Sequence, residues 1–420
     1  MRIGFVSTRF HGTDGVSLEA AKWAHVLEHD LGHQCFWFAG KLDTDPDVSH
    51  LCPEAFFEYP ENLAIQRALF CGSRFREQSL SDAVADFSTG LKMELRGFID
   101  RYEVDLLLPQ NILAIPMHIP LGLAVTDLAE EGMPILAHHH DFSWERARFK
   151  GGCAGDYLER AFPPAFSERF LHIVINSSAG ADLLQRRGVP SAVIPNVFDF
   201  EQPPSETDGY GDDFRDQLGI AADEVIVLQP TRVVPRKGIE FAIELCARLK
   251  VRLGREVCLV VSHTAGDEGF EYLDGLMRLA AQLGVRVLWV GDRVSDIRGN
   301  DLCGNKCYKL WDAYPHADLI TYPSLYEGFG NALLETFYFS KPVVVNRYSV
   351  FVEDIEPHGF QAVTMDGCLT DEVVNGAASL IEDKALAAQW AEHNYRICEK
   401  HYSYSTLRGS LGGFVDELSG

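Results

Sequence analysis

The sequence predicts an α/β protein with two doubly wound domains in tandem. Short apolar runs alternate with amphipathic helical segments through both halves of the 420-residue chain. Residues 198–219 separate the halves and are rich in proline, glycine and aspartate, which is typical of an interdomain linker. We therefore predict domains at residues 1–197 and 198–399, with a C-terminal helix at about 400–420 that returns to the first domain.

The first half opens with a strand at residues 2–8, an amphipathic helix at 17–32 that Gly32 ends, and a strand at 33–40. Later apolar runs end in polar residues, which is typical of parallel strands covered on both faces. These runs are residues 104–111, 134–141, 172–178 and 189–196.

The second half repeats this alternation after a short helix at the end of the linker. Strands are predicted at residues 224–231, 256–263, 285–292, 317–324 and 341–347, with helices at 238–250 and 270–284. Because ligands of such sheets bind beyond the carboxyl ends of the strands, polar motifs at those ends are candidate site residues.

Composition narrows the class of partner. The net charge is −24, which disfavours binding to nucleic acid and to anionic membranes and favours a small soluble acceptor. The N-terminus lacks an export-type apolar segment, and no apolar run approaches the roughly 18 residues of a membrane helix. Ten scattered cysteines fit reduced thiols. We expect a cytoplasmic protein without stable membrane insertion.

The turn after the first strand contains Gly12 and Gly15 and leads into a helix. Such a turn exposes backbone N–H groups that can hold an anion, although an ordinary strand-to-helix turn has the same composition. The pattern is not GxGxxG and no acidic residue follows at the ribose position, which disfavours a nicotinamide site.

Three consecutive histidines, His138, His139 and His140, end a predicted strand and precede Asp141. Strand geometry lets at most two of them share a face, and consecutive spacing is poor for zinc. A polar substrate contact at the sheet edge is favoured, with a hydrogen-bonded core histidine as the alternative. Cys303 and Cys307 lack a matching second pair, so no metal site is predicted.

Arg232 and Lys237 follow the predicted strand at 224–231, and Gly238 opens the next helix. Two cations at a helix N-terminus form a favourable site for a diphosphate, because the helix dipole adds to their charge. Solvated loop charges are the alternative.

The stretch LYEGFGNALLETF, residues 325–337, places Glu327 and Glu335 on either side of a glycine turn. Gly328 and Gly330 permit close approach of backbone to a ligand, and a helix begins at about Asn331. Glu335 then lies about one turn inside that helix. The two carboxylates are therefore predicted to meet different parts of one extended ligand, not to form an acid/base pair.

The motif EGFGNALLE, residues 327–335, resembles the E-x7-E motif of retaining glycosyltransferases of family 4, which have the GT-B fold. The resemblance covers nearly the whole chain, because the glycine turn, the strand-end histidine, residues 194–197 and residues 231–238 follow in the family's order. It implies two Rossmann-like domains facing a central cleft, with the acceptor on the first and a nucleotide-sugar on the second. A compatible-solute synthase is one member that would fit.

The resemblance also implies roles for single residues. The catalytic set would be His140, Arg232, Lys237 and Glu327, with the two cations on the diphosphate and Glu327 on the donor sugar. Donor-binding residues would be Gly15, Gly328, Phe329, Gly330, Asn331 and Glu335, the last on the ribose. His139, Asp141, Trp144 and Arg146 would bind the acceptor. Val197 departs from the family, which often has glycine there.

In the implied mechanism the acceptor hydroxyl attacks from the face that the nucleotide leaves, and the product keeps the α-configuration. No metal or other cofactor is implied, because the cations stabilise the leaving phosphate. GDP-mannose and UDP-glucose both fit as donors. The alternatives are a disaccharide phosphorylase of the same fold, a nucleotide-sugar epimerase, and a binding protein without catalysis.

Overall fold

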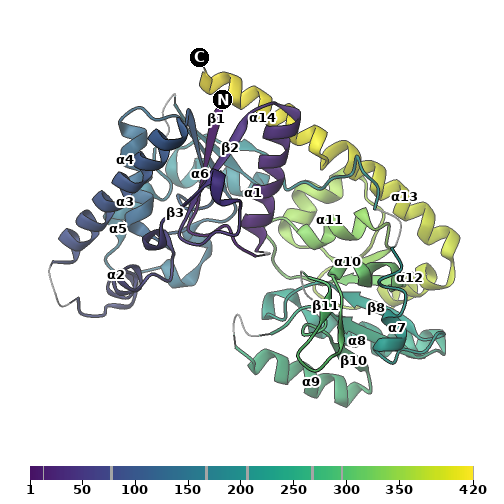
Figure 1. Ribbon diagram of the computed structural model, residues 1–420. Helices are drawn as coiled ribbons and strands as arrows, with labels where there is room; N and C mark the ends of the chain where they lie inside the picture. The colour runs from purple at the N-terminus through teal and green to yellow at the C-terminus, as the bar shows by residue number, and fades with distance from the viewer. Residues whose placement is uncertain are drawn as a thin grey trace. The chain divides into compact units, whose positions relative to one another are not determined.

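The computed structural model describes residues 1–12, 14–75, 79–165, 169–204, 208–265, 269–294 and 297–419. The chain forms two compact units, here called unit 1 (Met1–Val197 with Tyr404–Gly420) and unit 2 (Phe198–Ser403) (Figure 1). It passes from unit 1 to unit 2 after Val197 and returns after Ser403.

Unit 1 is built on a seven-stranded sheet in the order β3-β2-β1-β4-β5-β6-β7, and the paired strands are parallel. The strands are β1 Arg2–Val6, β2 Gln34–Ala39, β3 Ser49–Leu51, β4 Leu106–Pro109, β5 Ile135–His139, β6 Phe170–Val174 and β7 Ala192–Val193. The strand order reverses between β1 and β4, which is the place where doubly wound sheets bind ligands.

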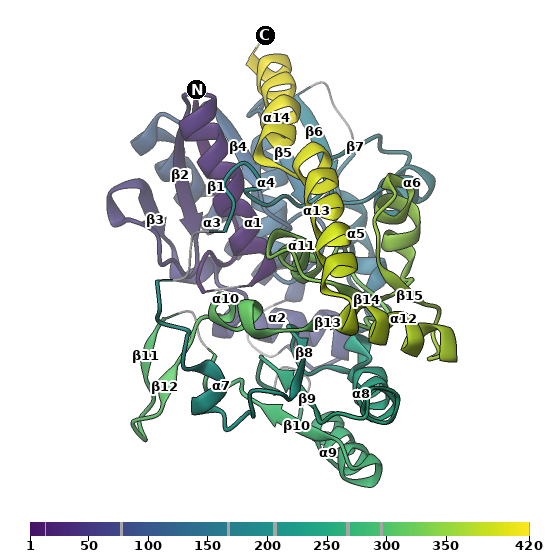
Figure 2. The ribbon, with the colours of Figure 1, turned by 90° about the vertical axis from the view of Figure 1, so that its right-hand side faces the viewer.

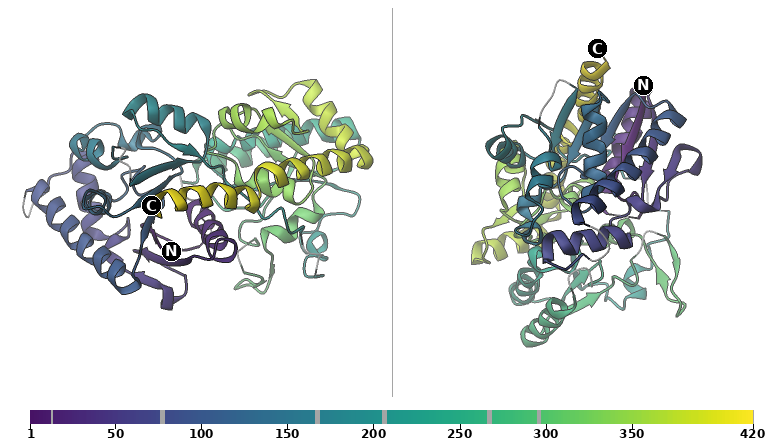
Figure 3. Two further views of the ribbon diagram at one scale, coloured as in Figure 1. Left: turned by 90° about the horizontal axis from the view of Figure 1, so that it is seen from above. Right: turned by 90° about the vertical axis from the view of Figure 1, so that its left-hand side faces the viewer.

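Helices cover both faces of this sheet (Figures 2 and 3). They are α1 Gly15–His25, continued by a π-helical turn at Val26–Asp30, α2 Pro60–Cys71, α3 Leu80–Tyr102, α4 Ile119–Glu130, α5 Gly155–Ala161, α6 Ser177–Arg187 and α14 Tyr404–Ser419. Helices α2, α3 and α4 pack on one face, and α1 and α14 pack on the other.

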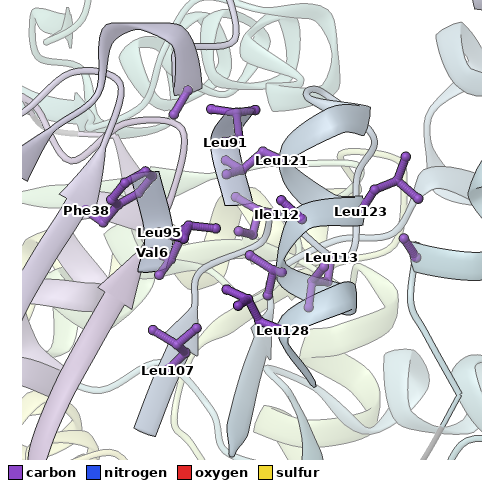
Figure 4. Packing of buried hydrophobic residues seen from close by; sticks show 14 of the residues in the cluster. Val6, Phe38, Leu91, Leu95, Leu107, Ile112, Leu113, Leu121, Leu123 and Leu128 are labelled. Atoms are coloured by element: carbon purple, nitrogen blue, oxygen red, sulfur yellow. The ribbon is translucent and has the colours of Figure 1, made fainter. Parts of the chain in front are cut away.

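Alternate strand residues explain the two layers. Val6, Phe38 and Leu107 point to the face covered by α3 and α4, where Leu95 and Leu128 pack around them (Figure 4). Their strand neighbours point to the opposite face and pack against α1 and α14. Every strand side chain in the middle of the sheet is therefore removed from water, which produces the continuous apolar runs of the sequence.

Unit 2 contains a six-stranded sheet in the order β10-β9-β8-β13-β14-β15, again with parallel pairs. The strands are β8 Val225–Gln229, β9 Val257–Val261, β10 Arg286–Trp289, β13 Leu319–Tyr322, β14 Val343–Asn346 and β15 Val363–Met365. Its helices are α7 Phe214–Gln217, α8 Ile239–Leu253, α9 Glu271–Leu283, α10 Leu310–Ala313, α11 Asn331–Tyr338, α12 Asp371–Glu382 and α13 Lys384–His401. A hairpin joins β11 Gly299–Asn300 to β12 Lys306–Cys307.

The predicted fold class is confirmed, because both units are Rossmann-like α/β structures with parallel sheets. Within the ranges given above, no helix is both long enough and apolar enough to cross a membrane. All ten cysteines are free thiols.

Candidate active site

The candidate donor site of unit 2 lies where its strand order reverses, between β8 and β13. Leu319 and Ile320 of β13 pair in parallel with Val227 and Leu228 of β8. The two strands therefore end at the same edge of the sheet. The segments that follow them, 230–238 after β8 and 323–330 after β13, come together there.

Gly238 allows these two segments to touch. It has φ of +59° and follows a short 3-10 turn at Pro235–Lys237. A Cβ atom at this position would lie 2.5 Å from the carbonyl oxygen of Pro323, which is too close for any side chain. The contact is continued by the backbone N–H of Leu325, which donates to the carbonyl oxygen of Arg236 at 2.8 Å.

Glu327 holds one cation on each carboxylate oxygen. Lys237 Nζ forms a salt bridge with Oε1 of Glu327, and Arg236 Nη1 donates to Oε2 at 3.1 Å. The same Arg236 nitrogen donates to the carbonyl oxygen of Tyr326 at 3.2 Å. Only 7% of Lys237 and 6% of Glu327 is exposed, so this ion pair is buried, and the partly exposed Arg236 adds a second positive charge to it.

Burial and neighbouring charges act in opposite directions on Glu327. Burial alone would raise the pKa of its carboxyl group, but Lys237 and Arg236 outweigh burial and lower this pKa below its ordinary value. Burial lowers the pKa of Lys237, and the charges of Arg236 and Arg232 act in the same direction while Glu327 opposes them. Glu327 is therefore ionised at neutral pH and retains its partners.

The sequence prediction paired Arg232 with Lys237 and did not include Arg236. In the structure Arg232 is exposed, although its charge is felt at Lys237, whereas Arg236 contacts Glu327 directly. The role of Arg236 could have been predicted from its position directly before Lys237 and after Pro235, since both cations lie in the same short turn.

The glycine loop is fixed by a tyrosine. Tyr348 is buried, and its hydroxyl donates to the carbonyl oxygen of Phe329 at 2.8 Å. Gly330 has φ of +129°, and a Cβ there would lie 2.5 Å from that hydroxyl oxygen. Gly330 directly precedes α11, so glycine is required both for the backbone conformation and for the space beside Tyr348.

Glu335 lies in α11 and has different partners from Glu327. Its Oε2 accepts a hydrogen bond from the hydroxyl of Tyr314 at 3.2 Å. Burial raises the pKa of Tyr314 well above its usual value, and the charge of Glu335 adds to this, so the phenol remains a donor. The two glutamates of the motif therefore interact with separate groups.

The histidines at the end of β5 divide between two sides of the sheet of unit 1. His138 Nδ1 and His140 Nε2 lie 3.0 and 3.3 Å from Oε1 of Gln110. His139 instead pairs with His172, with 2.9 Å between their ring nitrogens. Its predicted contact with acceptor would therefore be on the other side from His140. Among the residues described, no three His, Cys, Asp or Glu side chains are arranged to hold a metal.

Burial keeps these histidines neutral. It lowers the pKa of His140 to about 4, although Asp141 and Asp14 act to raise it. The pKa values of His138 and His139 are well below the usual value, again chiefly because of burial. At neutral pH His140 can therefore form hydrogen bonds but does not carry a positive charge.

Asn111 contacts two of the predicted site residues, His140 and Asp141. Its Oδ1 accepts the backbone N–H groups of His140 at 3.0 Å and Asp141 at 3.3 Å, and its Nδ2 donates to Oδ1 of Asp141 at 2.7 Å. Arg146 Nε donates to the other oxygen of Asp141 at 2.6 Å. Asn111 has φ of +61°, a conformation that asparagine tolerates better than most residues, and it was absent from the prediction.

Trp144 and Gly15 have surroundings that the sequence did not show. Trp144 stacks on the buried Phe142 with ring centroids 4.4 Å apart and packs into a small apolar cluster. At the start of α1, Asp14 already accepts the N–H groups of Val16 and Ser17. A phosphate at Gly15 would lie beside this carboxylate, which Arg9 Nε balances at 3.3 Å.

Comparisons with known proteins agree with this architecture. Residues 300–397 match the family model described as "Glycosyl transferases group 1". The chain is 32% identical to the mannosylglucosylglycerate synthase of Thermotoga maritima, over 98% of this chain and 99% of the relative. It is also 32% identical to the synthase of the same name from Petrotoga mobilis, over 87% of this chain and 86% of the relative.

A solved structure shows the same fold. Anabaena HepE, in complex with UDP and glucose, matches with a TM-score of 0.66 and 18% identity, over 99% of both chains. The resemblance that the E-x7-E motif indicated is thereby confirmed. The chain belongs to the GT-B glycosyltransferases of group 1, in the family that contains the mannosylglucosylglycerate synthases.

Proposed function

We propose that this protein is a retaining hexosyltransferase that transfers mannose from GDP-mannose to a hydroxyl group of glucosylglycerate. The product would be an α-linked mannosylglucosylglycerate. The product named for the two relatives supports this choice of sugar and acceptor over a UDP-glucose donor. We also propose that the reaction takes place in the cytoplasm, on soluble small molecules, since the chain carries a net charge of −24.

The observation that carries the proposed reaction is the cluster of the buried Glu327–Lys237 ion pair and Arg236. This cluster keeps an excess of positive charge at the carboxyl edge of the sheet, in a protein with few cations. A diphosphate is the natural ligand for such a charge beside the N-terminus of α11. In the donor complex the cations would bind the leaving phosphate, and Glu327 would accept hydrogen bonds from sugar hydroxyls.

The proposed chemistry is a front-face substitution. The acceptor oxygen bonds to the anomeric carbon on the side from which the phosphate oxygen leaves, and that phosphate oxygen takes the acceptor's proton. No carboxylate nucleophile is needed, which agrees with both oxygens of Glu327 being held by cations. The rate would come from stabilisation of the leaving phosphate and from positioning of the acceptor.

The same scheme predicts the role of His140 and predicts that turnover does not require a divalent metal. A neutral His140 would donate or accept one hydrogen bond to a sugar and would not serve as an acid at neutral pH. Since Lys237 and the neighbouring arginines supply positive charge to the phosphate, we expect turnover to persist in the presence of EDTA.

The test is transfer by the purified chain from GDP-mannose to glucosylglycerate, with the anomeric configuration of the product determined by NMR. Lys237→Ala should lower turnover by about 10²–10³-fold, because it removes a cation from the leaving phosphate. Lys250→Ala, which changes a half-exposed lysine of α8, is the matched control. A near-full rate in Lys237→Ala, a β-linked product, or phosphorolysis without nucleotide would each overturn the proposal.

A further inference from the structure

The segment after β5 concentrates positive charge next to the proposed acceptor contacts. Arg146, Arg148 and Lys150 fall within residues 146–150, shortly after His140 and Asp141, in a chain whose net charge is −24. A local excess of cations against an acidic background attracts an anion to this part of the surface.

Buried aromatic side chains hold this segment at both ends. At its start Phe142 is buried and stacks on Trp144. At its end Phe149 is buried and meets the ring of Phe70 edge-on, with centroids 5.2 Å apart. Two short 3-10 turns, Ser143–Glu145 and Ala147–Phe149, lie between these points. The charged residues between the aromatic ends are therefore presented to solvent from a fixed backbone.

The acidic groups of the segment are already engaged. Asp141 accepts from Arg146 Nε at 2.6 Å and from Asn111 Nδ2 at 2.7 Å. Glu145 Oε1 accepts the backbone N–H of Phe142 at 2.7 Å. The charge of Arg146 is thus balanced by Asp141, and neither Asp141 nor Glu145 forms a salt bridge with Arg148.

Arg148 and Lys150 both lack a salt bridge to a carboxylate in the described part of the chain, and Arg148 is the one that interacts electrostatically with Arg146 and Asp141. Arg148 is exposed overall, its guanidinium lies over the ring of Phe149 at 4.6 Å from the ring centroid, and it forms no salt bridge within the described part of the chain. Partial burial lowers the pKa of Arg148, and the neighbouring charge of Arg146 acts in the same direction while Asp141 opposes it. An anion placed here would relieve the repulsion between the two guanidinium groups.

We propose that Arg148, beside the Arg146–Asp141 ion pair, binds the carboxylate of the acceptor and makes the enzyme select anionic acceptors over uncharged glycosides. This inference rests on the proposed function, since it names what the charged end of the acceptor contacts. The planar guanidinium suits the task because it can donate two parallel hydrogen bonds to one carboxylate.

The test uses two acceptors that differ only at the carboxylate. Glucosylglycerate carries the acid, and glucosylglycerol has a CH2OH group in its place. Arg148→Ala should lower kcat/KM for glucosylglycerate by about tenfold to a hundredfold, the usual effect of losing a charged hydrogen-bond partner. It should leave kcat/KM for glucosylglycerol and the KM for the nucleotide-sugar unchanged. The kcat/KM of Arg148→Lys for glucosylglycerate should lie between those of the natural chain and of Arg148→Ala, because lysine keeps the charge and loses the planar guanidinium.

Arg96→Ala is the matched control, because Arg96 is an exposed arginine on α3 that pairs with Glu131. Arg96→Ala should leave kcat/KM unchanged for both acceptors. A loss in Arg148→Ala that is equal for both acceptors, or no loss for either, would overturn the proposed carboxylate contact.

Calorimetric titration of each acceptor in the absence of donor separates this inference from the proposed function. If the natural chain transfers mannose equally well to both acceptors, the proposed function stands and the inference falls. If it transfers to neither but binds glucosylglycerate in a manner that Arg148→Ala weakens, the inference stands and the proposed function falls. Absence of glucosylglycerate binding by the natural chain also overturns the inference.

Discussion

At the scale of single residues, the Glu327 carboxylate depends on two cations that occupy neighbouring positions in one turn. Lys237 takes one oxygen and Arg236 takes the other. Removing a partner from a buried carboxylate leaves charge that the protein must then stabilise by other means. The two cations differ in exposure, since 28% of the Arg236 side chain is exposed and 9% of that of Lys237.

We expect Arg236→Ala to lower the free energy of unfolding by about 1–2 kcal/mol, because Glu327 loses a charged hydrogen bond but keeps Lys237. Urea unfolding followed by a probe of unit 2 measures this change. Arg396→Ala is the control, since Arg396 lies on the exposed surface of α13 and pairs with Glu392 one turn earlier. The control should cost about 0.5 kcal/mol or less. Equal effects of the two substitutions would contradict the importance of the Arg236 contact.

Residue-level contacts mark the limit of what the sequence could predict. The motif identified Lys237 and Glu327, but the choice between Arg232 and Arg236 depends on how two loops from different strands meet at Gly238. His139 could not be separated from His140 by sequence position alone, because its partner His172 lies on β6. Such contacts are set by the order of strands in the sheet.

At the scale of structural elements, the loop before α11 combines a glycine backbone conformation with a close tyrosine. A Cβ at Gly330 would displace the Tyr348 hydroxyl and so disturb the hydrogen bond from Tyr348 to the carbonyl oxygen of Phe329. It would also strain the positive φ of residue 330.

We expect Gly330→Ala to reduce stability by about 1–3 kcal/mol and to weaken nucleotide binding, since it strains the loop. Tyr348→Phe removes the clashing oxygen, so the double variant Gly330→Ala/Tyr348→Phe should be less destabilised than the sum of the single variants. A double-mutant cycle on unfolding free energy measures this coupling. Strict additivity would contradict the proposed clash.

Helix α14 is the second element whose contribution can be measured. Four of its side chains, Leu407, Leu411, Val415 and Leu418, belong to the apolar core shared with α1. Leu411→Ala should cost about 2–5 kcal/mol, because it leaves a cavity in that core. Glu417→Ala, on the exposed side of the same helix, should have little effect. Similar midpoints of chemical denaturation for the two variants would show that α14 does not stabilise unit 1.

Buried parallel strands have a strong apolar signal, and β1, β2, β4 and β5 lie where they were expected. The strand predicted at 172–178 overlaps β6, Phe170–Val174, but its last residues belong to α6. The final strand of unit 1 was too long in the prediction, since β7 has two residues, Ala192–Val193. The predicted set lacked α2, α3 and α4. Helix α4 is buried on nearly all sides, so it has no polar face by which a helical period could be recognised.

At the scale of the whole molecule, both units place polar residues at the carboxyl edge of a parallel sheet. In unit 1, Gln110 and Asn111 follow β4, and in unit 2 the segments after β8 and β13 bring Lys237 to Glu327. Strand order in both units reverses at these places. The sequence could therefore predict where the candidate sites lie, because doubly wound sheets bind ligands at this edge. It could not predict which loops carry the supporting residues.

The charge state of unit 1 should make it sensitive to acid. Burial lowers the pKa to about 4 in His118 and His140, to about 3 in His172, and well below the usual value in His138 and His139. An unfolded chain binds protons at these histidines as the pH falls through about 6.5, while the folded unit does not. The stabilisation is therefore complete above that pH and is lost below it, by about 1.4 kcal/mol per pH unit for each histidine. We expect the urea midpoint of unit 1 to fall steeply between pH 7 and pH 5. In His172→Phe, the unfolding of unit 1 should take up about one proton fewer over this pH range, so the midpoint should fall less steeply. Equal midpoints at pH 7 and pH 5 in the natural chain would contradict the burial of neutral histidines.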